Sequence, residues 1–301
     1  MDQNNYKKQQ AQILVNLLTS GKFENAISKA IPLIKKFPNE YVFYNAAGMG
    51  LINLGKYEEA LKIFNQAIKL GENNIFVLNN LGLVHYFLKN YEISETYFIK
   101  VLKIKKEYFN ASINYANLKK QLHLIDEALE ILKAAIKYNP DNFLLHHNIA
   151  NVYHVVGDFR NSDLHFEKSL AINPAFTSSD RLMSMSTKYQ NKDDKHLKYL
   201  EKKVFNEKLN EKQKMHLYFA LGKAYNDIKD FHNSFANYKK GNDIQYKSLK
   251  YSLKEEIDIL LNTKKHFPSN KLELNKLLNK KRLFTCFYKL CKFKKISSFK
   301  Y

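Results

Sequence analysis

Gly21-Lys22-Phe23-Glu24-Asn25-Ala26 and Gly55-Lys56-Tyr57-Glu58-Glu59-Ala60 share one pattern 34 residues apart: a glycine, an aromatic residue two places later and an alanine three places after that. The period persists along the chain. The aromatic or apolar position continues as Tyr91, Ile125 and Phe159, the small position as Ser94, Ala128 and Ser162, and a third position carries Phe64, Phe98, Leu132 and Phe166. Self-similarity at a fixed period of this length is typical of repeat architectures, in which each unit packs on its neighbours.

Earlier in each unit, a bulky residue is followed by a small one. These pairs are Ala47-Gly48, Leu81-Gly82, Tyr115-Ala116 and Ile149-Ala150, and units end near Pro38, Pro140 and Pro174. The pattern resembles the tetratricopeptide repeat. The resemblance implies antiparallel helix pairs that stack into an all-α, right-handed α-solenoid, the TPR superhelix. Five units in unbroken register are predicted over residues 7–176, namely 7–40, 41–74, 75–108, 109–142 and 143–176.

The unit 41–74 illustrates the expected helix pair. Its first helix presents Tyr44, Ala47, Gly48 and Leu51 on one face, since these residues are spaced by three and four. Gly55 is expected at the turn, where glycine tolerates a left-handed backbone. The second helix presents Ala60, Phe64 and Ala67. One pair cannot cover both of its faces, so the units are expected to stack.

The register fails after Phe176 and then returns. Residues 215–248 contain a further TPR-like unit, with Leu221-Gly222, Phe231, Ser234 and Tyr238 at the expected offsets. Residues 177–214 are predicted to be a degenerate helical pair with a four-residue insertion near 191–194. Residues 249–276 are expected to hold a capping helix, and 277–301 a basic aromatic tail that is poorly ordered.

Asparagines recur on the first helices, which the resemblance places along a concave groove. An asparagine amide both donates and accepts, so a ladder of amides suits an extended peptide backbone. We therefore predict a peptide-binding groove. The alternative is that these side chains are simply solvated, because the chain is rich in asparagine throughout. The predicted groove residues are Asn45, Asn79, Asn80, Asn114, Asn117, Asn148 and Asn151.

Four histidines lie in the unit 143–176: His146, His147, His154 and His165. His146 occupies a bulky core position, the nearest carboxylate lies beyond the turn at Gly157, and no thiolate is near. Core or groove histidines are therefore expected, with no metal site and no cofactor.

The segment from Leu217 to Phe267 resembles the region that precedes the catalytic domain in bacterial tetratricopeptide-repeat sulfotransferases. In that family a phosphate-binding Pro-Arg-Ser-Gly-Thr-Thr type loop follows. No such loop occurs here, since the last glycine is Gly241 and the last proline is Pro268. We therefore predict a non-catalytic scaffold that binds a protein or peptide segment. The alternative is the substrate-recognition half of a truncated or split TPR-sulfotransferase.

The net charge of +20 is concentrated at the end of the chain. Between Tyr246 and Tyr301 there are fifteen basic and four acidic residues, and only three of the 49 basic residues of the chain are arginines. Binding of nucleic acid or of an anionic membrane surface is accordingly expected only through residues 277–301. No stretch has the length and hydropathy to span a bilayer, the N-terminus has no apolar export signal, and the two cysteines form no framework, so a cytoplasmic location is expected.

Overall fold

The computed structural model describes residues 3–248, 257, 258 and 260–262. Residues 1–242 form one compact unit and residues 243–301 a second. Of the predicted capping region 249–276, the five described residues are helical, and its other residues and the tail 277–301 lie outside the described residues. The described chain contains no strand, and its fourteen numbered helices are α1 (Gln3–Thr19), α2 (Phe23–Lys36), α3 (Tyr41–Asn53), α4 (Tyr57–Ile68), α5 (Ile75–Phe87), α6 (Tyr91–Ile104), α7 (Phe109–Gln121), α8 (Ile125–Tyr138), α9 (Phe143–Val155), α10 (Phe159–Ile172), α11 (Ser178–Ser186), α12 (Lys195–Lys203), α13 (Glu211–Asp227) and α14 (Phe231–Ser248).

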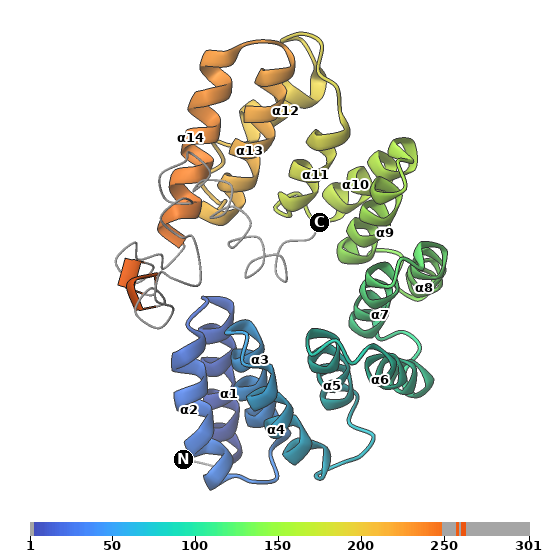
Figure 1. The fold of residues 1–301 in the computed structure, drawn as a ribbon, viewed down its shortest axis with the longest axis vertical. Helices are drawn as coiled ribbons and strands as arrows, with labels where there is room; N and C mark the ends of the chain where they lie inside the picture. Colours follow the sequence, from blue (N-terminus) through green and yellow to red (C-terminus); the bar gives the residue numbers. More distant parts are fainter. Residues whose placement is uncertain (1–2, 249–256, 259, 263–301) are drawn as a thin grey trace, which may run out of the picture. The chain divides into compact units, whose positions relative to one another are not determined.

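The helices of the unit 1–242 stack in chain order. From α1 to α11 each helix packs against the next, and α3, α5, α7, α9 and α11 also contact one another in series. Within this stack, α5 and α7 lie on the inner side of the curve and α6 and α8 on the outer side (Figure 1). The fold is therefore the right-handed α-solenoid of helix pairs that the sequence predicts.

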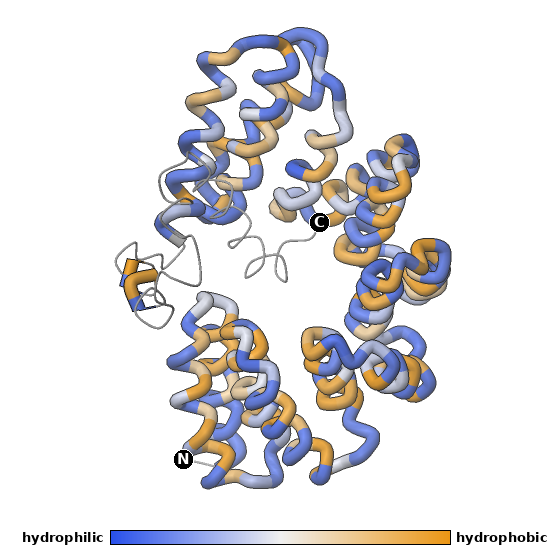
Figure 2. Tube along the Cα trace, in the orientation of Figure 1, coloured by the Kyte–Doolittle hydropathy of each residue, from blue (hydrophilic) through white to orange (hydrophobic). Residues whose placement is uncertain are grey.

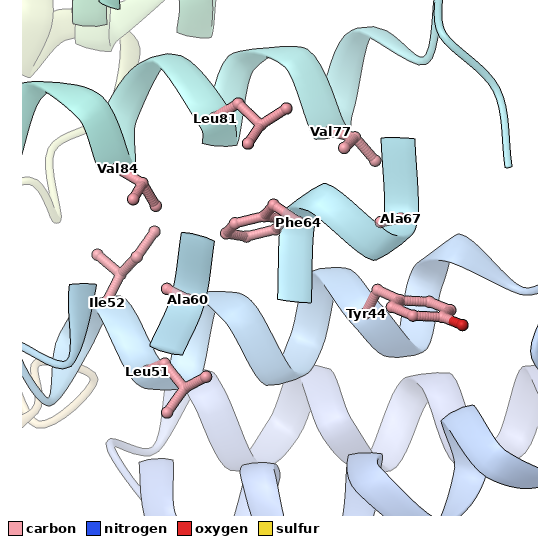
Figure 3. Packing of buried hydrophobic residues seen from close by; sticks show 9 residues of the cluster. All are labelled: Tyr44, Leu51, Ile52, Ala60, Phe64, Ala67, Val77, Leu81 and Val84. Atoms are coloured by element: carbon pink, nitrogen blue, oxygen red, sulfur yellow. The ribbon is translucent and has the colours of Figure 1, made fainter. Parts of the chain in front are cut away.

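Phe64 shows how one pair is attached to the next. Its ring is fully buried and extends from α4 toward Val77 and Leu81 of α5, with Ala60 one turn before it on α4 (Figure 3). Hydrophobic residues recur along the helices at intervals of about one turn (Figure 2). Each pair thus buries apolar surface against both neighbours, which is the main favourable contribution to folding.

Small residues on the first helices make room for bulky residues on the second. A Cβ atom added at Gly48 meets Phe64 Cζ at 2.3 Å, and one added at Gly222 meets Tyr238 Cδ1 at 2.8 Å. The same close approach occurs between Gly82 and Phe98. These residues are 16 positions apart in each repeat, so the predicted small and bulky positions pack directly against each other.

The turns inside the pairs share one backbone conformation. The prediction that Gly55 adopts a left-handed conformation is confirmed, with φ of 74°, and Gly21 and Gly157 adopt it at the equivalent positions. Backbone hydrogen bonds from Gly55 N to Ile52 O and from Lys56 N to Leu51 O close the turn in a Schellman motif. Non-glycine residues take the same place in the other turns, namely Lys89, His123 and Lys229, with φ of 62–63°.

Lys89→Gly is expected to raise the free energy of unfolding by about 0.5–1 kcal/mol. The left-handed conformation costs an L-residue about 1–2 kcal/mol, and the greater entropy of glycine in the unfolded chain offsets part of that gain. Urea unfolding followed by circular dichroism measures the change. Asn90→Gly is the control, because Asn90 has a φ of −84° and glycine there is expected to be destabilising. An unchanged or lowered stability in Lys89→Gly would contradict the prediction.

The segment between the fifth and last recognisable units departs from the regular pairs. Its helices α11 and α12 are each nine residues long and pack more against α13 than against each other. The connection 187–194 between them is longer than the three-residue turns of the other pairs, and it contains the positions 191–194 where the sequence predicts an insertion.

An ion pair is buried in this irregular segment. Lys203 Nζ of α12 lies 2.7 Å from Asp180 Oδ2 of α11, and the two side chains are 7% and 0% exposed. Lys203 also donates to the Tyr199 hydroxyl at 2.9 Å. Burial raises the pKa of Asp180 to about 6, and the charge and hydrogen bond of Lys203 oppose that rise. A buried pair of this kind depends strongly on both partners being present.

Candidate functional site

The first helices α3, α5, α7 and α9 present a continuous surface, which we call the first-helix face. Each of these helices contacts the next one in the series, and side chains 35 positions apart in the sequence meet between them. The predicted asparagines lie on these four helices: Asn45 on α3, Asn79 and Asn80 on α5, Asn114 and Asn117 on α7, and Asn148 and Asn151 on α9.

Four of these asparagines form one chain of hydrogen bonds. Asn114 Nδ2 donates to Asn79 Oδ1 at 3.0 Å, and Asn79 Nδ2 donates to Asn80 Oδ1 at 3.3 Å. Asn80 Nδ2 in turn donates to Asn45 Oδ1. We call this the amide chain. It connects α7, α5 and α3, and thereby ties the first helices of three repeats together.

The two ends of the amide chain differ chemically. Within the described part of the protein, Asn114 Oδ1 and the Asn45 Nδ2 group make no hydrogen bond. One end therefore offers an acceptor and the other a donor, which are the two groups that complement a peptide backbone. Asn45 and Asn114 are half buried, whereas Asn79 and Asn80 are buried.

The other three predicted asparagines do not join the amide chain. Asn148 Nδ2 donates to the Leu144 carbonyl of its own helix at 2.7 Å. Asn151 is buried and accepts from Lys120 Nζ at 2.8 Å. Asn117 is half buried on α7. Lys120 is not among the residues that the sequence predicts for the groove. Periodicity carries no signal for it, because the equivalent positions in the neighbouring repeats hold Tyr86 and His154.

Aromatic side chains lie one helical turn before the amide chain. Tyr41 precedes Asn45 by four residues on α3, and Phe76 precedes Asn80 by four on α5, so each pair shares a helix face. The rings of Tyr41 and Phe76 are stacked with centroids 6.1 Å apart and are 39% and 43% exposed. The amide chain is thus bordered by an exposed aromatic pair.

The histidines of the fifth unit are held within the fold. His146 is buried, as predicted for its core position, with Nδ1 3.0 Å from His165 Nδ1 and Nε2 3.0 Å from the Pro140 carbonyl oxygen. Because that carbonyl only accepts, His146 Nε2 must carry the proton, and its Nδ1 accepts from His165. Burial lowers the pKa of His165 to about 4, and neighbouring positive charges lower it too.

No group of three or more histidine, cysteine, aspartate or glutamate residues in the described chain could hold a metal ion. Nor is any of the described helices long and apolar enough to cross a bilayer.

Three family models match the chain. One, for the TPR repeat, matches residues 51–88, and two, for the tetratricopeptide repeat, match residues 77–112 and 109–142. The chain therefore contains tetratricopeptide repeats, as its sequence pattern predicts. The resemblance of the segment after Leu217 to sulfotransferases stays a prediction.

Curated relatives are similar over part of their length. BBSome complex member BBS4 of Bos taurus is 26% identical over 127 residues, which cover 41% of this chain and 24% of BBS4. Protein FlbA of Caulobacter vibrioides is 22% identical over 157 residues, which cover 52% of this chain and 26% of FlbA. The chain thus spans about a quarter of the length of these relatives.

Two solved structures share the fold. A human IFIT1 dimer with PPP-AAAA matches with a TM-score of 0.61 and 20% identity, over 90% of this chain and 64% of that one. PilF of Pseudomonas aeruginosa matches with a TM-score of 0.52 and 14% identity, over 78% of this chain and 99% of that one.

Proposed function

We propose that this array of tetratricopeptide repeats is a non-catalytic scaffold that binds an extended segment of a partner protein across the first-helix face. The amide chain from Asn114 to Asn45 is the observation that carries the proposal. Its free acceptor and donor ends suit a peptide backbone whatever the side chains of the segment are. That similar repeats occur in a member of the BBSome complex also supports a role in protein assembly.

In this proposal the asparagines of the face have two tasks. Asn79 and Asn80 are buried and bonded to their neighbours, so in this proposal they hold the surface in place. Asn45 and Asn114 are half buried and contact the peptide backbone. The stacked Tyr41 and Phe76 rings receive an apolar side chain of the segment, since exposed aromatic pairs supply contact area at low entropic cost.

The test is a selection of peptides from a random library on the full chain, followed by affinity measurements on the Asn45→Ala/Asn114→Ala double variant. We expect a loss of about tenfold or more in affinity, because two backbone hydrogen bonds disappear. Asn25→Ala/Asn65→Ala is the matched control, since these exposed asparagines lie on the second helices α2 and α4. Circular dichroism checks that helix content is retained. Equal affinity of both double variants, or a selection that yields no binding peptide, would count against the proposal.

A further inference from the structure

Lys120 is a half-buried cation on α7 without a carboxylate partner. Its Nζ atom donates to Asn151 Oδ1 at 2.8 Å and forms no ion pair within the described residues. Burial lowers the pKa of the Lys120 ammonium below its usual value. Removing a cation from water is unfavourable unless an anion compensates it, and a neutral amide does so only in part.

Arg181 on α11 is in the same situation. Its guanidinium stacks on the Phe219 ring, with Cζ 4.6 Å from the ring centroid, and is half buried. It makes no side-chain hydrogen bond or ion pair in the part of the chain that the structure describes, and burial lowers its pKa. All donors of its planar fork are therefore available to a carboxylate.

Three other cations withdrawn from solvent do have carboxylate partners. Lys119 lies 2.6 Å from Glu95 and 2.9 Å from Glu127, Lys203 lies 2.7 Å from Asp180, and Lys223 lies 2.6 Å from Asp227. Lys120 and Arg181 differ from these three lysines, because burial lowers the pKa of each and neither has a carboxylate partner among the described residues.

Two histidines lie on α9 and α13, the helices that pack against α11 on either side in the chain order. His147 on α9 has Nδ1 2.9 Å from Ser179 Oγ, and His216 on α13 has Nδ1 3.2 Å from Thr177 Oγ1. Burial lowers the pKa of His147 to about 4, and the charge of Lys120 and the neighbouring His216 ring lower it further. Burial also lowers the pKa of His216 to about 4, and the charge of Arg181 adds to that effect. Ser179 and Thr177 lie at the start of α11, beside Arg181, and Asn151, the partner of Lys120, lies one turn after His147 on α9, so the four groups lie on adjacent helices. Each Nε2 atom makes no hydrogen bond to another described residue.

We infer that Lys120, His147, Arg181 and His216 form a site for the carboxylates of an acidic peptide segment. The inference rests on the proposed function, because α7 and α9 also carry predicted groove asparagines, and a peptide on the amide chain reaches this site next. A bound carboxylate compensates the two buried cations, and each ring Nε2 atom, when it carries the proton of the neutral imidazole, donates to it.

The number of charges favours an acidic peptide over nucleic acid. Near neutral pH both histidines are uncharged, so the site presents two fixed positive charges, which match one or two carboxylates. Nucleic-acid binding usually relies on a run of cations along the phosphate backbone, with aromatic rings on which bases stack. Here the Phe219 ring is covered by Arg181, and the Phe176 ring packs edge to face against His147.

The experiment measures fluorescence anisotropy of a short labelled peptide of alternating glutamate and alanine, with a glutamine-alanine peptide of the same length for comparison. We expect the full chain to bind the glutamate peptide at least about tenfold more tightly, and the Lys120→Met/Arg181→Met variant to lose that preference. Lys56→Met/Lys198→Met is the control with the same change in net charge, since both lysines lie on the surface beside Glu59 and Asp193. It is expected to keep the preference.

Folding is checked by thermal unfolding, because removal of two uncompensated cations is expected to leave the melting temperature unchanged or raise it. A glutamate preference that persists in Lys120→Met/Arg181→Met overturns the inference, as does equal loss in the control or failure to bind either peptide. Tighter binding of a labelled oligoadenylate through the same two residues also overturns it. If both peptides bind equally and both depend on Asn45 and Asn114, the proposed function stands and the acidic preference alone is wrong.

Discussion

Lys203→Met is expected to lower the free energy of unfolding by about 3–5 kcal/mol near pH 8, because it leaves the Asp180 carboxylate buried without its partner. Asp180 is fully buried, and its Oδ1 atom already has no hydrogen bond within the described chain. Only Oδ2 is compensated, by Lys203 Nζ at 2.7 Å. Urea unfolding followed by circular dichroism measures the loss, and hydrogen exchange in α11 and α13 shows whether it is confined to that segment.

The loss of stability caused by Lys203→Met is expected to grow between about pH 6 and pH 8. In the unfolded chain Asp180 ionises near its ordinary pKa of about 3.9, whereas burial raises its pKa in the folded protein to about 6. Below that pH the Asp180 carboxyl is protonated in the folded wild type and in folded Lys203→Met. The difference between their free energies of unfolding is therefore constant there. Above that pH the wild-type carboxyl is ionised beside Lys203, whereas the Asp180 carboxyl of the variant stays protonated in the folded state. Since Asp180 is ionised in the unfolded chain, the free energy of unfolding of the variant falls by about 1.4 kcal/mol per pH unit.

Two further variants separate the missing partner from other effects. Asp180→Leu/Lys203→Met replaces the pair by apolar side chains and is expected to recover most of the loss, because no buried charge is left. Lys198→Met removes an exposed pair with Asp193 and is expected to cause no measurable change. A loss of the same size at pH 6 and pH 8, or a double variant as unstable as Lys203→Met, would show that pairing is not the cause.

Gly48→Ala is expected to lower the free energy of unfolding by about 1–3 kcal/mol, although alanine is the better helix former by about 1 kcal/mol. The added methyl carbon meets the Phe64 ring at 2.3, 2.6 and 2.7 Å. The ring is fully buried and confined by Val77 and Leu81 of the next repeat, so it cannot move aside without disturbing that interface. The sign of the change therefore distinguishes packing from helix propensity.

The fourth repeat indicates how the clash can be relieved. There Ala116 and Leu132 hold the positions of Gly48 and Phe64, and both are buried in one core cluster. Gly48→Ala/Phe64→Leu copies that combination and is expected to be more stable than the sum of the two single changes, by about 1 kcal/mol or more. If urea unfolding shows that the stability changes of Gly48→Ala and Phe64→Leu simply add up in the double variant, then the two residues do not pack in the same space.

The turns show where sequence reasoning reached its limit within the repeats. Glycine at Gly21, Gly55 and Gly157 indicates the left-handed backbone, because glycine adopts it without strain. Lys89, His123 and Lys229 adopt the same φ without any such signal. The helices on either side are fixed by their packing, and the short turn between them has one conformation that closes the Schellman hydrogen bonds.

The asparagines show the same limit at the candidate site. The offsets predict correctly that Asn45, Asn79, Asn80 and Asn114 lie on neighbouring first helices. They do not predict that these side chains bond to one another, because that depends on the distance and rotation between α3, α5 and α7. The structure therefore reduces the ladder of seven amides to a bonded chain of four with two free ends.

The amino-acid pattern alone predicts the repeat, the small and bulky positions of each helix pair and hence the α-solenoid. These features recur every 34 residues and depend on contacts within a pair or with the next pair. Which ionisable side chains come together depends instead on the packing of distant helices. Asp180 and Lys203 lie 23 residues apart in the segment without a period, and Lys120, His147, Arg181 and His216 come from four helices. Their proximity follows from how α11 packs on α13 and how the first helices align, and no local pattern encodes that packing.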